Sequence, residues 1–179
     1  MTTRNEKRLA MTKEELEKIV AYDPETGIVT WKQDRTTGKG GSRTMRLAGK
    51  EAGHLRDNGY RVVSINYCAI YTHRLAWFLV HGQWPRHELD HIDTDRSNNR
   101  ITNLRPANGT QNRANTGRRS HNRTGFKGVT TMKGVSGYTA QISVGGVTRY
   151  LGRYRTAEQA HKAYCKAAQK AFGEFARAS

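Results

Sequence analysis

The feature that most constrains this chain is a long stretch without any acidic side chain. Residues 96–157 contain twelve Lys or Arg residues and no Asp or Glu, whereas residues 1–95 contain 15 basic and 13 acidic residues. A folded segment of this kind repels itself unless phosphates lie against it, and each neutralised phosphate also releases condensed counterions. Of the two interpretations, a solvated basic face and a surface that binds nucleic acid, we favour the second.

The length and composition favour two small modules with modest cores. The chain has 179 residues, of which 35% are hydrophobic, and a formal net charge of +16. Cys68 and Cys165 are far apart and lack CxxC spacing, so neither a disulfide framework nor a cysteine-based zinc site is indicated. The N-terminus lacks a signal-peptide core, and the longest apolar run, residues 75–80, is too short to span a bilayer. We therefore expect a soluble cytoplasmic protein with no membrane partner.

Local signals in residues 1–83 predict a mixed scaffold of helices and hairpins. Thr12 and Glu15 form a capping box before an apolar stripe, which predicts a helix over residues 12–22. The other elements that we expect are a strand at 28–31 after the turn at 23–27, a long loop or irregular hairpin over 34–53, strands at 60–65 and 69–72, and a helix over 73–80 that Gly82 stops.

The last third of the chain predicts a three-stranded sheet under one helix. The expected strands are residues 126–131, 138–144 and 147–151, and Gly145-Gly146 forms the two-residue turn of a hairpin. Thr156 begins a second capping box and a helix with a face of small residues. Alternation along the strands predicts that one set faces the helix and another faces outward; the outward set is Thr139, Gln141, Ser143, Thr148 and Tyr150.

A polar series in residues 84–115 contains the parts that phosphodiester cleavage requires. This chemistry needs a base for water, a metal that holds the scissile phosphate, and a frame that aligns them. His91 can accept a proton at cellular pH, because the ordinary pKa of imidazole is about 6.5. Asp90 offers a hard oxygen that suits Mg²⁺, and Asn112 offers a second one without adding charge.

Several short motifs resemble the HNH family of phage and intron-encoded homing endonucleases. They are HRLAW (73–77), GQWP (82–85), DHID (90–93), NNR (98–100), NL (103–104) and QN (111–112), preceded by YDPETGIVTW (22–31) and GY (59–60). The resemblance implies a finger of two strands and a helix around one divalent metal, which hydrolyses duplex DNA to 5′-phosphate and 3′-hydroxyl ends.

The same resemblance implies a role for each residue of the site. Asp90 resembles the first metal ligand, His91 the general base, Asn103 the Asn that ties the loop together and orients the base, and Asn112 the second metal ligand. Asn112 occupies the position of the second His in the name HNH. This resembles a subgroup of the family in which that last position is Asn. We favour Mg²⁺ over Mn²⁺, and the zinc-stapled version of the fold is not supported because its cysteines are absent. For His73 we favour packing or capping over catalysis, and for Asp93 an outer partner of the site and a turn former both stay open.

Residues 125–176 resemble the AP2 DNA-binding domain. The motifs are GFKGV (125–129), YTAQISV (138–144), RYLGRY (149–154), TAEQAHKAY (156–164) and FGEFA (172–176). The resemblance implies a sheet that lies in the major groove. Charge and resemblance together make these residues candidate DNA contacts: Arg100, Arg105, Arg113, Arg118, Arg119, Arg123, Lys127, Thr130, Lys133, Gln141, Ser143, Thr148, Arg149, Tyr150 and Arg153.

We therefore predict an α+β protein with four parts. They are an N-terminal scaffold (1–83), a ββα-metal HNH nuclease core (84–115), a basic linker (116–124) and an AP2-like domain with a three-stranded antiparallel sheet packed on one helix (125–179). The predicted function is a site-directed, homing-type endonuclease or nickase for double-stranded DNA, acting in the bacterial cytoplasm if the chain is phage-encoded. A monomer is the simplest state, and dimerisation on DNA stays open. The main rival is a non-catalytic DNA-binding regulator with a degenerate HNH module, and a weaker one is an RNA-binding protein.

Overall fold

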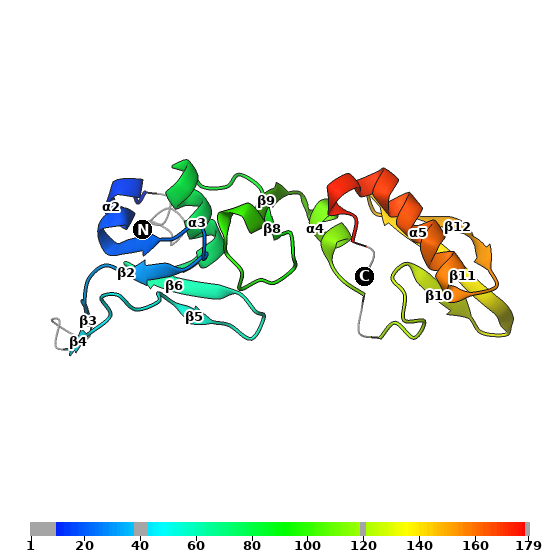
Figure 1. Cartoon of the computed structure of the whole chain (residues 1–179), viewed down its shortest axis with the longest axis horizontal. Helices are drawn as coiled ribbons and strands as arrows, with labels where there is room; N and C mark the ends of the chain where they lie inside the picture. The colour runs from blue at the N-terminus through cyan, green and yellow to red at the C-terminus, as the bar shows by residue number, and fades with distance from the viewer. Residues whose placement is uncertain (1–9, 38–42, 119–120, 178–179) are drawn as a thin grey trace, which may run out of the picture. The chain divides into compact units, whose positions relative to one another are not determined.

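The chain is a mixed α+β protein, as predicted, with small antiparallel sheets and few helices (Figure 1). The computed structural model describes residues 10–37, 43–118 and 121–177. The chain divides into two compact units, Met1–Pro106 and Ala107–Ser179. In the part of the chain so described, no helix is long and apolar enough to cross a membrane.

In its described residues, the first unit is built from short strands, two α-helices and one 3-10 helix. Its sheets pair β1 with β2, β3 with β4, β5 with β6 and β7, and β8 with β9. The elements are α2 (Lys13–Ile19), β1 (Val20–Tyr22), β2 (Val29–Trp31), β3 (Arg35–Thr37), β4 (Arg43–Met45), β5 (His54–Leu55), β6 (Arg61–Ile65), β7 (Cys68–Tyr71), α3 (Thr72–His81), β8 (Glu88–His91), the 3-10 helix η2 (Ile101–Asn103) and β9 (Leu104–Ala107).

Helix α2 begins where the sequence predicts and ends three residues early. Both capping-box hydrogen bonds are present, from Glu15 N to Thr12 Oγ1 at 3.2 Å and from Thr12 N to Glu15 Oε2 at 2.9 Å. The prediction that the helix extends to residue 22 is wrong, because residues 20–22 pair with β2 in register, Val20 opposite Trp31. The β-branched and aromatic side chains of this segment favour the strand.

One apolar core holds the first unit together. Its fully buried side chains come from α2, β1, β2, β6, β7 and α3; they are Leu16, Val20, Val29, Val63, Ile65, Ile70 and Leu75. Residues 34–53 contain the β3–β4 hairpin, the second of the two predicted alternatives. Helix α3 ends at Gly82 as predicted, with a left-handed φ of 71°. These elements form the platform for β8 and the loop that follows it.

The second unit is a three-stranded sheet covered by a helix. Strand β11 lies between β10 and β12, and α5 packs against the sheet. The elements are α4 (Gly109–Asn115), β10 (Val129–Met132), β11 (Val135–Val144), β12 (Val147–Tyr154), α5 (Ala157–Phe172) and the 3-10 helix η3 (Gly173–Phe175). The predicted strand at 126–131 begins only at Val129, whereas β11 and β12 each extend three residues beyond the predicted strands.

The predicted alternation of β11 is present in part, because Thr139 and Gln141, which were predicted to face outward, are half-buried. Ala140 and Ile142 are buried against the helix, whereas Ser143, and Thr148 and Tyr150 of β12, are exposed. The assignment of this sheet to the AP2 family stays a prediction. Helix α4 belongs to the second unit, although its sequence motif had grouped it with the nuclease core of residues 84–115.

Gly128 should be required for packing of the second unit. A Cβ there would overlap the ring of Tyr164 on α5, and its φ is +74°. We expect Gly128→Ala to lower the free energy of unfolding by about 3 kcal/mol, from overpacking and backbone strain together. Denaturant unfolding measures this. Gly134→Ala is the matched control, since its φ is +77° and nothing lies within 4 Å; equal losses in the two variants would contradict the packing argument.

Candidate active site

The candidate site is built on the β8–β9 hairpin and the loop that joins its strands (Figure 1). Asp90 and His91 end β8, and both are buried, with exposed fractions of 8% and 4%. The loop begins with turns that acidic side chains cap. The Asp93 carboxylate accepts the N–H of Asp95 at 2.8 Å, and the Asp95 carboxylate accepts the N–H of Ser97 at 2.9 Å. The sequence DTDRS therefore folds locally into consecutive turns after the strand.

Asn103 joins the two ends of this loop. Its Nδ2 donates to Asp93 Oδ1 at 2.9 Å and to the Asn98 carbonyl at 2.8 Å, and its Oδ1 accepts the Asp93 N–H at 3.1 Å. Asp93 also accepts a hydrogen bond from Asn98 Nδ2 at 2.6 Å. Asn103 therefore has the contacts of a residue that closes a loop. Asp93 takes part in the same closure through its hydrogen bonds with Asn103 and Asn98. The catalytic part predicted for Asn103 stays a prediction.

The His91 ring is enclosed by polar and aromatic side chains. Its Nε2 lies 3.3 Å from Asn99 Oδ1, and the centroids of the Tyr60 and His73 rings lie 5.9 and 5.2 Å from its own. Burial lowers the pKa of His91, while the Asn99 hydrogen bond and the nearby Asp side chains oppose that shift. A lowered pKa keeps the imidazole neutral at cellular pH, which is the form that accepts a proton.

His73 lies in the first turn of α3 and packs beside the site. Burial, followed by the charges of His91 and Arg74, lowers its pKa to about 3, so it stays neutral. Its ring stacks on Tyr71 at 5.6 Å and lies 5.2 Å from Tyr60. These contacts agree with the packing role that we favoured. Its contact with His91 was not predictable from residues 18 positions apart in the sequence.

Asp90 is held by an arginine from the neighbouring strand. Its Oδ2 accepts hydrogen bonds from Arg105 Nε at 3.0 Å and Nη2 at 2.9 Å, and the two side chains are 10% and 12% exposed. Arg105 is one of the predicted DNA contacts, whereas the structure places it on this carboxylate. The pairing of β8 with β9 brings the two residues together, and their spacing in the sequence does not reveal it.

The Asp90 carboxylate is an oxygen donor of the kind that a divalent metal with few protein ligands takes. Among residues 10–37, 43–118 and 121–177 no group of three or more His, Cys, Asp or Glu is placed to hold a metal. Mg²⁺ commonly takes only one or two protein oxygens and completes its shell with water and phosphate. The Asp90 carboxylate is such a donor, although Arg105 already engages one of its oxygens. Asn112 belongs to α4 in the second unit, so its part as a ligand stays a prediction.

Comparison with known proteins decides the family. Residues 70–114, from β7 to α4, match the HNH endonuclease family. An uncharacterised HNH endonuclease of Acanthamoeba polyphaga mimivirus is 32% identical over 132 residues, which cover 73% of this chain and 67% of that protein. The chain belongs to the HNH endonuclease family. No solved structure matches this HNH endonuclease. The viral relative comes from a giant virus, so a bacteriophage source stays a prediction.

Several basic residues that we predicted as DNA contacts bind the HNH endonuclease's own backbone. Arg100 Nε donates to the Glu25 carbonyl at 2.6 Å, and Arg118 Nη1 donates to the Asn122 carbonyl at 3.0 Å. Lys127 Nζ donates to the carbonyls of Ala114, Thr116 and Arg177 at 2.5, 2.6 and 3.2 Å, and burial lowers its pKa to about 8. Three acceptors use all three donors of the ammonium group, so Lys127 holds the end of α4. Arg119 lies outside the described residues.

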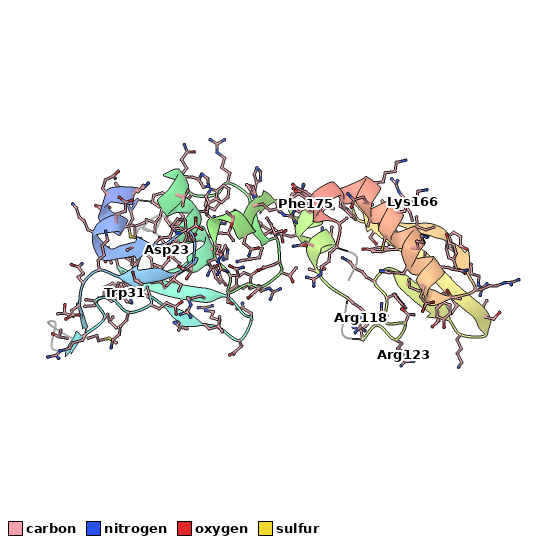
Figure 2. All side chains as sticks on the ribbon, in the orientation of Figure 1. Asp23, Trp31, Arg118, Arg123, Lys166 and Phe175 are labelled. Carbon is pink, nitrogen blue, oxygen red and sulfur yellow. The ribbon has the colours of Figure 1, made fainter. Side chains whose placement is uncertain are left out.

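Most of the contacts predicted in the second unit lie on its surface, Arg118 included. Arg118 and Arg123 lie on the segment between α4 and β10 (Figure 2). Gln141 is half-buried; the exposed candidates are Arg113, Arg118, Arg123, Thr130, Lys133, Ser143, Thr148, Arg149, Tyr150 and Arg153. A cavity of about 740 Å³ lies among α4, the segment that follows it and the strands β10 and β11. The described residues that line it include Arg113, His121 and Arg123, and none of them is Asp or Glu.

Sequence reasoning missed the residues that support His91. Asn99 is only 2% exposed and contacts the ring, and Tyr60 packs beside it. The signal was present but not specific, because NNR and the Gly-Tyr pair were recognised as motifs without any residue being given a role. Adjacent Asn98 and Asn99 have the same chemistry, so only the fold tells which one points to the imidazole.

The Asp90–Arg105 pair should contribute strongly to stability. Arg105→Met keeps the length of the side chain and leaves the buried Asp90 carboxylate without its guanidinium, so we expect the free energy of unfolding to fall by about 3 kcal/mol. Denaturant unfolding at neutral pH measures the change. Arg149→Met, on the exposed surface of β12, is the matched control and should change stability by no more than about 0.5 kcal/mol. A loss at Arg105 no larger than this would contradict the assigned role.

Proposed function

We propose that this HNH endonuclease is a homing-type enzyme that hydrolyses phosphodiester bonds of duplex DNA, with one divalent metal and His91 as the general base. One observation carries the proposal: the buried imidazole of His91 follows the Asp90 carboxylate directly at the end of β8, next to a loop that Asn103 closes. Both residues lie within the segment that matches the family. A nuclease site needs this pair of a proton acceptor and an oxygen ligand.

The proposed division of roles follows from the chemistry of each side chain. His91 takes a proton from the attacking water, since burial lowers its pKa and so favours the neutral ring. Asp90, with Asn112 as the second oxygen donor, would hold Mg²⁺, or Mn²⁺ as the alternative. When bound, the cation would orient the scissile phosphate and stabilise the leaving 3′ oxygen. Asn103 keeps the loop in one conformation, so that His91 stays fixed during the reaction.

The second unit is proposed to hold the duplex. The exposed polar face of β11 and β12 matches the AP2-like interpretation, in which the sheet reads the major groove. The basic cavity beside it, lined by Arg113 and Arg123 and without acidic residues, favours contact with phosphates. These contacts would direct the cut to particular sites. Cleavage of one strand and of both strands are both compatible with the proposal.

A second function is favoured by one specific observation. Arg105 engages Asp90 Oδ2 through two hydrogen bonds, and a guanidinium in that place repels a cation. A chain in which this pair never opens would be a DNA-binding regulator with a degenerate nuclease module. Nicking of a supercoiled plasmid with Mg²⁺, followed by addition of EDTA, separates the two functions. Metal-dependent nicking supports the enzyme, and binding without nicking supports the regulator.

Replacing the proposed base should separate catalysis from binding. We expect His91→Ala to slow plasmid nicking by about 100- to 10,000-fold, the usual contribution of a general base, while DNA affinity stays nearly unchanged. Nicking rates and gel-shift titrations measure the two properties. His54→Ala is the control, since that histidine is exposed on β5 and has no proposed role. Equal losses of binding and cleavage in His91→Ala would contradict the assignment.

Replacing an arginine of the basic cavity should affect binding alone. We expect Arg123→Gln to weaken DNA binding and to reduce the slope of log affinity against log salt by about one, because one phosphate contact is lost. Binding titrations at several salt concentrations measure the slope. Lys32→Gln removes an equally exposed charge from the first unit and serves as the control. An unchanged slope in Arg123→Gln would show that this cavity does not bind phosphate.

A further inference from the structure

Asn99 contacts the proposed base in a way that fixes the position of a proton. Its Nδ2 donates to the Ser97 carbonyl at 3.1 Å, while its Oδ1 lies 3.3 Å from His91 Nε2. A carbonyl oxygen only accepts hydrogen bonds, so the amide nitrogen must face Ser97 and the amide oxygen must face the imidazole. An amide oxygen is also only an acceptor, so His91 Nε2 must carry the hydrogen. In the neutral ring, the lone pair is then on Nδ1.

We propose that Asn99 is a positioning residue, which selects the His91 tautomer whose Nδ1 is free of hydrogen and accepts the proton of water. This inference rests on the proposed function, because it assumes that His91 is the base. The tautomer itself is a property of the protein without metal or DNA. Which ring nitrogen is basic depends on the hydrogen bond that the other one makes.

Residues 22–27 contact the backbone of Asn99 and hold it in place. The Tyr22 hydroxyl donates to the Asn99 carbonyl at 2.8 Å, and burial raises the pKa of Tyr22 to about 12, which keeps it a donor. At Gly27, whose φ is +76°, a Cβ would lie 2.6 Å from the Asn99 carbonyl carbon and would overlap Arg100 N. Only glycine allows this approach. The motif that spans Tyr22 to Gly27 therefore has a structural role: it supports the peptide group between Asn99 and Arg100.

Further contacts fix the same junction. Arg100 Nε donates to the Glu25 carbonyl at 2.6 Å, and Ile101 N donates to the Pro24 carbonyl at 3.4 Å. Within the turn, the Asp23 carboxylate, labelled in Figure 2, accepts hydrogen bonds from Glu25 N and the Thr26 hydroxyl. These hydrogen bonds within the turn hold the segment that contacts the loop. An Asn on a mobile loop would impose no tautomer, whereas one held at this junction does.

Aromatic rings limit the motion of His91 itself. The rings of Tyr60 and His73 contact the imidazole, at 56° and 76° to its plane. The neutral His73 adds no charge that would repel a proton on its neighbour. With the ring packed in this way and Nε2 held by Asn99, rotation of the imidazole would break the hydrogen bond to Asn99.

The test measures the tautomer directly. In the full-length protein without metal, ¹⁵N NMR of the histidine rings distinguishes a hydrogen on Nε2 from one on Nδ1, and the spectrum of His91→Gln assigns the His91 signals. We expect the wild type to carry the hydrogen on Nε2. Asn99→Leu, which has no acceptor, should show a mixture of both tautomers. Asn99→Asp keeps an oxygen acceptor and should keep the hydrogen on Nε2.

A second pair of variants tests whether Tyr22 supports Asn99. It also keeps the inference testable if Asn99→Leu does not fold. Tyr22→Phe removes the hydroxyl that holds the Asn99 carbonyl but leaves the Asn99 side chain, so we expect a smaller shift toward hydrogen on Nδ1. Tyr67→Phe is the matched control, since that side chain is 96% exposed, and should leave the tautomer unchanged. In plasmid nicking, Asn99→Leu should lower kcat by at least tenfold with KM unchanged, and Asn99→Asp should recover part of the loss.

The outcomes separate this inference from the proposed function. Hydrogen on Nδ1 in the wild type overturns the inference, and so does an unchanged tautomer in folded Asn99→Leu. If Asn99→Leu does not fold, Tyr22→Phe decides: a shift relative to Tyr67→Phe supports the inference, and its absence overturns it. If the tautomers behave as expected but the wild type does not nick DNA, the role of Asn99 toward His91 stands and the proposed function fails.

Discussion

The closure of the loop by Asn103 is the interaction on which the rest of the site depends. Three hydrogen bonds from one amide tie Asp93 to Asn98, and the Asn103 carbonyl accepts the N–H of Ile92. His91 lies just before this closed segment and Asn99 lies within it, so one amide sets the distance between the imidazole and its partner. A buried amide with both its donor and its acceptor groups engaged tolerates few alternatives. The loop is therefore a fixed frame, which a base needs if it is to face a phosphate in a single orientation.

The Asp90–Arg105 ion pair bears on two properties, the stability of the fold and the affinity for a metal. The Asp90 carboxylate is buried and forms an ion pair with Arg105, whose loss would leave its charge without the guanidinium. A divalent metal would meet the same need more strongly. Arginine and metal would then share or compete for one carboxylate, so the strength of the ion pair would set the affinity for the metal. The same contact therefore explains the stability of the fold and also the rival interpretation as a regulator.

Sequence predicted the features that depend on near neighbours. The Thr12 capping box, the stop of α3 at Gly82 and the burial of Ala140 and Ile142 on β11 follow from local rules, and the structure contains them. The failures come from long-range contacts. Helix α2 is shorter than predicted because residues 20–22 pair with a strand, and the Tyr22 hydroxyl reaches a carbonyl 77 residues away. The motifs place the candidate site in β8 and its loop, but no spacing rule distinguishes Asn99 from Asn98 as the partner of the imidazole.

The basic stretch from residue 96 onward shows why counting charges overestimates contacts with phosphate. Arg100 and Lys127 donate hydrogen bonds to backbone carbonyls of the protein, and Arg105 donates to the Asp90 carboxylate. Hydrogen bonds to carbonyl dipoles do not remove the charge of a cation, so Arg100 and Lys127 still add to the positive field. Attraction of DNA and recognition of DNA therefore depend on different groups. Attraction uses the summed charge, whereas recognition depends on exposed donors such as Arg123 and Arg149, a set that excludes the half-buried Arg105 and Lys127.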